Sequence, residues 1–336
     1  MPSPQETDRA RGALYGLAIG DALGMPTQLL SRQEITGRWG PLLSGFEPAP
    51  PGHPIAAGMP AGAVTDDTEQ AVLLGRLLLS GPVDPCELAD ALIAWERDMA
   101  ARGSLDLLGP STRRAVEAVL AGTPPEKAGA SGDTNGAAMR IAPVGVTNAA
   151  DDLPALVGAV HGASLVTHNT SVALSGAAAV AAAVSAGIGA ANSGAGSVAE
   201  ATEVAIAAAR LGAQCGHWVA GAEVAARIGW AAGLVRGLPA AEAAPVIYSL
   251  VGTSLATQES VPAAFAVLSA VPDDPWRACL LAASLGGDCD TIAAMAGAVA
   301  GACHGLAAFP PHAVAVIDAQ GFALADLADS LLARRS

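Results

Sequence analysis

The sequence predicts an all-α fold. Helix-forming composition and helical periodicity recur along the chain, whereas the alternating runs of Val, Ile, Thr and aromatic residues that mark strands are absent. Aromatic residues make up only 3% of the chain, and 39 glycines add to a large share of alanine. Because small side chains let helices approach closely, we expect one body of tightly packed helices.

Eleven segments carry the helical signal. In chain order they are residues 11–23, 68–80, 85–99, 111–120, 171–186, 198–211, 218–233, 261–269, 275–285, 291–306 and 323–334. Pro- and Gly-rich loops separate several of them, and Pro310-Pro311 is expected to close the main body. No loop is long or polar enough to require a linker. We therefore expect a flexible N-terminal tail at 1–10 and a single domain over 11–336.

The uncharged stretch 172–191 raises the question of a membrane helix. It consists mainly of Ala, Gly and Ser, which contribute little to insertion, so we expect a buried helix of the protein interior and no membrane partner. Residues 1–8 are polar and lack the apolar core of a signal peptide.

The composition disfavours several other classes. With a net charge of −14 the chain has no basic patch to release counterions from phosphates, so nucleic acid is not an expected partner. Lys127 is the only lysine and stands outside any GK[ST] motif, which disfavours a Walker-type loop and Schiff-base chemistry. Five cysteines without C-x-x-C spacing indicate the reduced thiols of a cytoplasmic protein.

Two acidic clusters are the most informative feature of the chain. Residues 65–68, with the sequence TDDT, and residues 286–291, with GGDCDT, each stand where a loop turns into an apolar helix. If the two helix starts meet, four carboxylates crowd into one apolar setting, and such a group needs cations. Oxygen ligands select hard ions, so the clusters predict Mg²⁺ or Mn²⁺, singly or as a pair.

Each cluster alone has an ordinary explanation as a helix cap. Thr65 and Asp288 are good N-cap residues, and acids in the first turn are favoured by the helix dipole. The two clusters together favour a binding site over two separate caps. A nearly charge-free helix follows each cluster, so both helix starts should point out of a buried core.

A second candidate binding element is the loop 131–136, SGDTNG, before the helical segment AAMR. Such a loop can present backbone N–H groups to a phosphate, although Asn-Gly equally favours a plain turn. His161 and His168 are seven residues apart, which predicts one face of a helix, and no Cys or third His is spaced to complete a zinc site.

Together these residues resemble the ADP-ribosylglycohydrolase family, the group that includes the dinitrogenase reductase-activating glycohydrolases. The resemblance runs from about residue 11 to residue 305. It rests on ordered blocks, GLAIGDALG at 16–24, TDDT at 65–68, NGAAMRIAP at 135–143, TH at 167–168, ESVP at 259–262 and GGDCDT at 286–291. It implies a single-domain orthogonal helical bundle of the ADP-ribosylglycohydrolase type, with two Mg²⁺ or Mn²⁺ ions, that cleaves a bond to the anomeric carbon of ribose.

The resemblance also implies roles for individual residues. Positions that match the family's metal ligands are Thr65, Asp66, Asp67, Asp288, Asp290 and Thr291. Positions that match its ligand-binding residues are Ser131, Gly132, Asp133, Thr134, Asn135 and Gly136 of the diphosphate-binding loop, His168 and Leu255. As catalytic residues, Asp67 or Asp290 would orient or deprotonate the attacking water.

The chain departs from the family pattern in two places. Seven residues after Asp21, where the family often has a glutamate that touches a metal or the substrate, stands Gln28, whose amide cannot act as a base. Asp133 adds a negative charge where a diphosphate would approach. Gln28 argues against cleavage of ADP-ribose esters or ADP-ribosyl arginine, and repulsion from Asp133 favours a substrate with fewer phosphates. A nucleoside-like N-ribosyl compound is therefore a serious alternative.

Three functions therefore stay open on the sequence alone. The first is a metal-dependent hydrolase that cleaves a ribosyl bond in an ADP-ribosylated protein or small molecule. The second is an N-ribosyl nucleoside hydrolase of the same family, and the third is a non-catalytic ADP-ribose-binding or structural protein on the same fold. The intact acidic clusters favour an enzyme.

Overall fold

The structure, a computed structural model, describes residues 2–103, 108–192 and 197–335. Over these ranges every regular element is a helix. The β-structure there consists of two isolated bridges. The elements are α1 (Pro4–Gly24), α2 (Arg32–Trp39), α3 (Asp66–Leu78), α4 (Pro85–Ala101), α5 (Pro110–Leu120), α6 (Pro125–Ala128), α7 (Gly136–Met139), α8 (Ala142–Thr147), α9 (Leu153–Ser164), α10 (Ser171–Gly189), η1 (Ala190–Asn192), α11 (Val198–Gly212), α12 (Val224–Val235), α13 (Ala240–Val246), η2 (Ile247–Val251), α14 (Thr257–Ala270), α15 (Pro275–Ala283), α16 (Cys289–His304), η3 (Leu306–Ala308), α17 (Pro311–Asp318) and α18 (Leu324–Leu332). The all-α prediction is confirmed.

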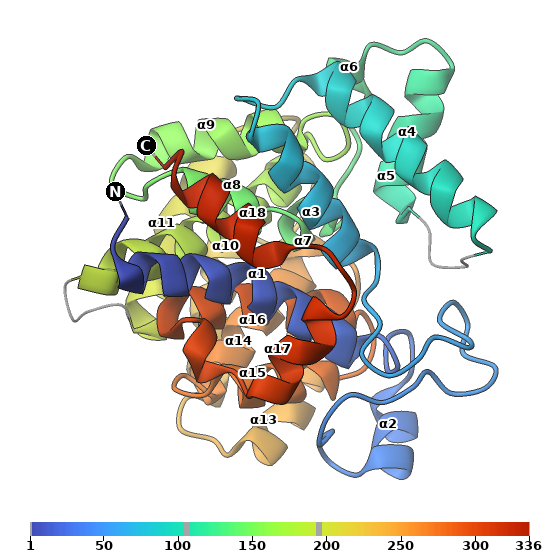
Figure 1. Cartoon of the computed structure of the whole chain (residues 1–336), viewed down its shortest axis with the longest axis vertical. Coiled ribbons are helices and arrows are strands. Elements are labelled where there is room, and N and C mark those ends of the chain that lie inside the picture. The colour runs from blue at the N-terminus through green and yellow to red at the C-terminus, as the bar shows by residue number, and fades with distance from the viewer. Residues whose placement is uncertain (1, 104–107, 193–196, 336) are drawn as a thin grey trace.

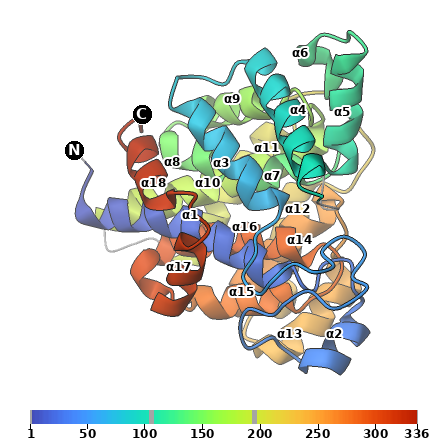
Figure 2. The ribbon, with the colours of Figure 1, turned by 45° about the vertical axis from the view of Figure 1, so that its right-hand side comes forward.

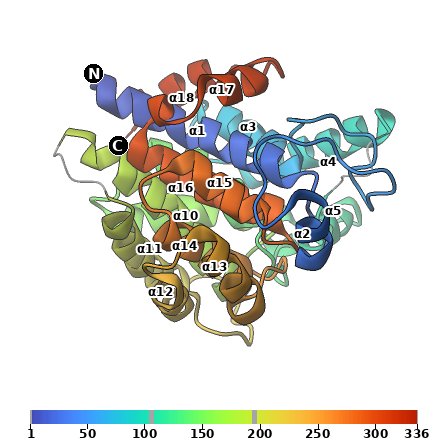
Figure 3. The same ribbon diagram turned by 90° about the horizontal axis from the view of Figure 1, so that it is seen from below.

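Helices α1 and α16 come from opposite ends of the chain and pack side by side through the middle of the molecule (Figure 1; Figure 3). Their backbones meet at glycines, Gly12, Gly16 and Gly20 on α1 and Gly297 and Gly301 on α16. A Cβ added to Gly297 would lie 2.0 Å from the carbonyl oxygen of Gly16, and one added to Gly16 would lie 2.1 Å from that of Gly297. Glycine is therefore required for this close approach.

Helix α10 is the buried helix expected from the uncharged stretch. By length and composition its 19 residues could cross a membrane, with a mean hydropathy of 1.8, yet 89% of the apolar window is buried inside the protein. It packs against α8, α9, α11 and α16. Its apolar surface is thus covered by other helices.

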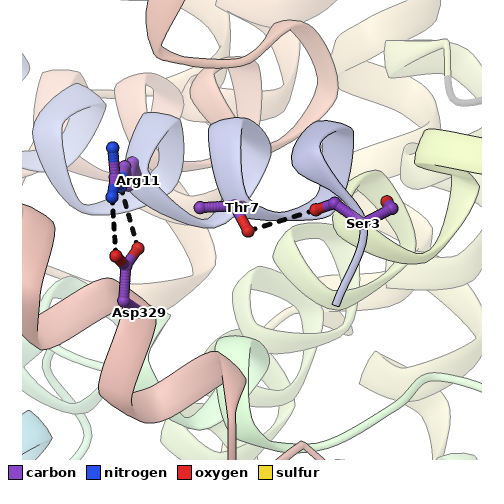
Figure 4. A network of polar contacts seen from close by, with 4 residues as sticks. All are labelled: Ser3, Thr7, Arg11 and Asp329. Carbon is purple, nitrogen blue, oxygen red and sulfur yellow. Dashed lines mark hydrogen bonds and ion pairs between the residues drawn. The ribbon is translucent and has the colours of Figure 1, made fainter. Parts of the chain in front are cut away.

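The N-terminal residues are helical, which corrects the predicted flexible tail at 1–10. Helix α1 begins at Pro4, and Ser3 caps it in a reciprocal pair of hydrogen bonds with Glu6 of 3.1 and 2.7 Å. The Thr7 hydroxyl donates to the Ser3 carbonyl at 3.1 Å (Figure 4). This capping box satisfies the free N–H groups of the first turn, so polar residues start a helix here. Residue 1 lies outside the described ranges.

The C-terminal helices belong to the main body, which corrects the expectation that Pro310-Pro311 closes it. Pro311 is the first residue of α17, a position where the missing N–H of proline does no harm. Helix α18 then packs against α1, α3 and α8. Arg11 of α1 donates to both carboxylate oxygens of Asp329 of α18, at 2.8 and 2.6 Å (Figure 4).

The predicted helices are present with shifted ends. The largest shifts concern the segment predicted at 11–23, which is observed as α1, starting at Pro4, and the segment predicted at 218–233, which is observed as α12, starting at Val224. The predictions missed α2, α6, α8, α9, α13 and α17. Five of these six have between four and eight residues, and α9 has 12. Short helices carry a weak periodic signal.

The elements that carry the acidic clusters and the loop meet near one end of α1. The N-terminal ends of α3 and α16 and the short α7 contact one another, and Figure 2 shows them as neighbours. The fold thus places segments from three distant parts of the sequence around one spot.

Candidate active site

The structure brings the two acidic clusters together. Thr65 is the N-cap of α3 and Asp288 that of α16. The Thr291 hydroxyl of α16 donates to Oδ2 of Asp67 in α3 at 3.2 Å, across 224 positions of sequence. The two helix starts therefore point at the same place.

Asp67 is buried with one carboxylate oxygen open. Its side chain is 1% exposed, and Oδ1 has no hydrogen-bond partner among the described residues. Burial raises the pKa of Asp67 well above its usual value, and neighbouring carboxylates raise it further, namely those of Asp66, Asp21, Asp290 and Asp288. Such a group is destabilised as an anion and would be stabilised by a cation.

Asp21 is a structural partner of the site that we did not assign from the sequence. It is fully buried in α1 and accepts hydrogen bonds from the backbone N–H groups and the hydroxyls of both Thr65 and Thr68, at 2.5 to 3.1 Å. Burial raises its pKa to about 6 despite these donors. Asp21 thereby fastens the N-terminus of α3 to α1. A lone carboxylate in an otherwise uncharged helical segment was the signal for it.

Asn135 connects the loop to the second cluster. Its side-chain amide donates to Asp288 at 2.5 Å and to the Ser260 hydroxyl at 3.0 Å. Its backbone N–H donates to the Leu255 carbonyl at 3.0 Å. This N–H is already satisfied within the protein, so Asn135 holds Asp288 and the loop in place.

The two clusters and the loop line one cavity of about 130 Å³. The predicted site residues on its wall are Gln28, Asp66, Thr134, Asn135, Gly136, Leu255, Asp288, Asp290 and Thr291. Apolar Ile55 and Met139 also line it. Thr65 and Asp67 lie just behind the wall, at 1% exposure each.

The first half of the predicted loop does not line the cavity. Ser131 and Asp133 are exposed, and the Asp133 carbonyl accepts from the Thr257 hydroxyl at 2.8 Å. Gly132 is buried against the chain near Thr167, because a Cβ there would lie 1.9 Å from the Thr167 carbonyl. The charge of Asp133 therefore stands outside the space that a ligand would fill.

Gln28 lines the cavity in the turn that follows α1. Its side chain is 4% exposed, and Nε2 has no hydrogen-bond partner among the described residues. The His53 ring donates through Nε2 to the Gln28 carbonyl at 2.8 Å, which steadies the turn. An open, buried amide that lines a cavity is placed to donate to a ligand.

The two histidines do not share a helix, which corrects the prediction. Helix α9 holds His161 and ends at Ser164, before His168. His168 is fully buried behind the loop and bonds Thr167 and Thr134. Burial lowers its pKa well below the usual value, helped by the positive charges of Arg140 and Arg114, so the ring is neutral. His168 does not line the cavity itself.

The donor set fits a hard cation, although the side chains are not in final coordination. Among the residues described, no group of three or more His, Cys, Asp or Glu side chains is placed to hold a metal ion as it stands. Three of the carboxylates accept protein donors instead: Asp288 from Asn135, Asp66 from Gln70 at 2.9 Å, and Asp67 through Oδ2 from Thr291. The open oxygen of Asp67 and the neighbouring carboxylates offer oxygen atoms only, the donor type that a hard cation prefers.

Known proteins resemble this chain over its whole length. The family model of ADP-ribosylglycohydrolase matches residues 2–336. Uncharacterized protein YegU of Escherichia coli K12 is 36% identical over 317 residues, 94% of this chain and 93% of its own. ADP-ribosylarginine hydrolase Tri1 of Pseudomonas putida is 32% identical over 183 residues, 51% of this chain and 44% of its own. A solved ADP-ribosylglycohydrolase-related protein complex shares the fold, with a TM-score of 0.68 over 99% of this chain and 100% of that chain at 24% identity.

Proposed function

Because the chain belongs to the ADP-ribosylglycohydrolase family, we propose that it is a divalent-metal-dependent hydrolase that cleaves the ribosyl bond of an ADP-ribosylated protein or small molecule. Membership makes the chain a glycosidic hydrolase rather than a binding protein. The observation that supports the metal-dependent mechanism best is the contact between Thr291 and Asp67, which joins the two acidic clusters. We keep a cytoplasmic location as part of the proposal, since all five cysteines are free.

The cations would be held by the carboxylates of the two clusters, with Thr65 or Thr291 adding a hydroxyl. The carboxylates are those of Asp66, Asp67, Asp288 and Asp290. Divalent cations at such ligands supply charge neutralisation and water activation.

The remaining chemistry belongs to the side chains. The carboxylate of Asp67 or Asp290 orients or deprotonates the attacking water as the bond to the anomeric carbon breaks. The leaving group departs with the bonding electron pair and takes up the proton from the carboxylic acid so formed. The open Nε2 of Gln28 donates to an oxygen of the sugar or of the leaving group. Ile55, Met139 and Leu255 provide apolar walls that limit the access of bulk water.

The size of the cavity indicates which part of the substrate it holds. At about 130 Å³ it is smaller than the ~300–1,000 Å³ of pockets that enclose whole ligands. It therefore suits the ribosyl ring, and the rest of an ADP-ribosyl group would extend past Leu255, which is 41% exposed.

The position of Asp133 favours an ADP-ribosyl substrate over a nucleoside. The nucleoside alternative depended on repulsion between this carboxylate and a diphosphate. Asp133 is exposed and off the cavity wall, which removes that argument. Tri1 of Pseudomonas putida, named as an ADP-ribosylarginine hydrolase, supplies the first substrate to try.

Removal of metal is expected to abolish hydrolysis. We expect ADP-ribose release from ADP-ribosylarginine to be more than ~100-fold faster with Mg²⁺ or Mn²⁺ than with EDTA, because a cation contributes several kcal/mol to such a reaction. The measurement is the initial rate by chromatography, with a purine nucleoside as the parallel substrate. Equal rates in EDTA would contradict metal dependence, and cleavage of the nucleoside alone would favour the nucleoside hydrolase.

The variant Gln28→Glu is expected to turn over ADP-ribosyl substrates faster and to bind metal as tightly as the wild type or more tightly. The new carboxylate joins Asp66, Asp288 and Asp290 on the cavity wall, so it also lowers the melting temperature of the metal-free protein by adding a buried like charge. The exposed Gln33→Glu on α2 is the matched control, since it adds the same charge at the surface. Identical rates for wild type and Gln28→Glu would show that position 28 does not set substrate choice.

A further inference from the structure

A chain of hydrogen bonds crosses the core from the first acidic cluster toward the loop. Its centre is Arg140, which is 1% exposed. Arg140 donates to Gln70 at 2.8 Å and to the Thr167 hydroxyl at 2.5 Å, and Gln70 donates to Asp66 at 2.9 Å. The proposed function assigns no role to Arg140 or Thr167, and buried polar groups arranged in this way fix one conformation of a site.

Chemistry fixes the direction of the Arg140 bond, and the directions at His168 are inferred from it. A guanidinium group only donates, so the Thr167 oxygen accepts from Arg140 and keeps its own proton for a second partner. The neighbour placed to accept this proton is Nδ1 of His168, at 2.8 Å. In the neutral ring an accepting Nδ1 places the proton on Nε2, which donates to the Thr134 hydroxyl oxygen at 3.0 Å.

The Thr134 hydroxyl is the end of this chain and lies on the cavity wall. Its oxygen is occupied as an acceptor by His168, so its proton is free to be donated. Gly136 lets the loop lie directly on the ring, since a Cβ there would be 2.8 Å from Cε1 of His168. The same threonine faces the cavity together with Asn135 and Asp288.

We propose that Arg140, Thr167 and His168 are positioning residues that preset Thr134 as a hydrogen-bond donor to an oxygen atom of the ligand. The inference rests on the proposed function, because it takes the cavity as the ribosyl site. It gives His168 a role behind the loop, acting through Thr134 without touching the ligand. A preset donor selects an acceptor oxygen and disfavours a group that only donates.

Two pairs of variants test the role of this donor in binding ADP-ribose with Mg²⁺ present. Thr134→Val removes the hydroxyl at nearly constant shape and is expected to raise the Kd about 10-fold, the effect of one hydrogen bond, whereas Thr134→Ser keeps Kd near the wild-type value. The Asn side chain in His168→Asn no longer reaches Thr134, so this variant should lose as much affinity for ADP-ribose as Thr134→Val does. The variant His168→Gln should retain more of the affinity. The Mn²⁺ affinity should stay close to the wild-type value in Thr134→Val, and Thr202→Val on α11 is the control away from the cavity.

The double variant separates a positioning role from an independent one. If His168 acts through Thr134, His168→Asn adds no further loss of affinity to Thr134→Val. Fully additive losses would overturn the inference, as would wild-type affinity in Thr134→Val. If the wild-type protein with metal binds no ADP-ribose, the proposed function fails and the inference fails with it. If the wild-type protein binds ADP-ribose and Thr134→Val binds it equally well, only the inference fails. The two failures are therefore distinguishable.

A spectroscopic measurement without any ligand tests whether the His168 ring leaves Thr134 free to donate. In protein labelled with ¹⁵N-histidine, the signal that is absent from His168→Gln is expected to show the neutral ring protonated at Nε2. Protonation at Nδ1 would overturn the inference, because Thr134 would then donate to the ring and have no proton for a ligand.

Discussion

Replacing Asp67 with Asn is expected to abolish metal-induced stabilisation while making the metal-free protein more stable. The pKa of Asp67 is raised by burial and by the neighbouring carboxylates. A raised carboxyl pKa contributes stability below the unfolded value of 3.8, and that contribution is lost as the pH rises through the folded pKa. At alkaline pH Asp67 therefore destabilises the metal-free fold relative to the unfolded chain, and the neutral amide removes this penalty.

Asp67→Asn should raise the stability of the metal-free protein but lower the stabilisation that metal adds. At a metal concentration of about 100 Kd, binding stabilises the wild-type fold by ~2.7 kcal/mol, and Asp67→Asn should lose this gain. Removal of one direct ligand should also reduce hydrolysis by more than ~100-fold. Melting curves at pH 8 with EDTA and with Mg²⁺ or Mn²⁺ measure both effects.

The control for this experiment is Asp90→Asn, at an exposed position of α4. It removes the same charge without touching the cluster, so its melting temperature should respond to metal as the wild type does. Asp290→Asn, on the other helix start, should lose the metal response as Asp67→Asn does. Unchanged metal binding by calorimetry in both cluster variants would contradict the assigned ligands.

The second large effect is expected at the crossing of α1 and α16. Gly297→Ala places a Cβ 2.0 Å from the carbonyl oxygen of Gly16 and 3.0 Å from Sγ of Cys279, so the two helices must move apart. Overpacking in a core typically costs ~1–3 kcal/mol, and a clash with backbone should reach about 3 kcal/mol or more. The N-terminus of α16 carries Asp288 and Asp290, so metal binding should weaken as well.

Gly158→Ala on α9 is the matched control. Gly158 is exposed, and a Cβ there meets no atom within 4 Å. Alanine should stabilise this helix by roughly 0.5–1 kcal/mol through its better helix propensity. Urea unfolding of both variants gives the comparison. If Gly297→Ala were as stable as Gly158→Ala, the close approach of α1 and α16 would not hold in solution.

The sequence was sufficient to predict the all-α fold and the meeting of the two acidic clusters. The helices that follow the two clusters carry almost no charge and must be buried. Only their polar N-terminal ends can reach the surface of the core, so these ends are expected to lie together. The sequence also singled out the loop 131–136, and the resemblance to a known family gave it the role of a diphosphate-binding loop. Of its residues, Thr134, Asn135 and Gly136 line the cavity, whereas Ser131 and Asp133 face outward.

Other features depend on contacts that a linear pattern does not contain. The spacing of His161 and His168 fits one helix face, but α9 ends at Ser164 without a Gly or Pro to mark its end. Asp21 gains its importance from Thr65 and Thr68, which are more than forty positions away. Helix α1, which takes in the N-terminal residues, packs against α18 from the other end of the chain.

Diffraction from a crystal of the wild-type protein grown with Mn²⁺ tests the central claim most directly. The anomalous signal of the metal locates it independently of any assumption about the substrate. We expect Mn²⁺ between the N-termini of α3 and α16, with carboxylate oxygens of Asp67 and Asp290 among its ligands. An anomalous map with no peak between these helix starts at saturating Mn²⁺ would contradict the account.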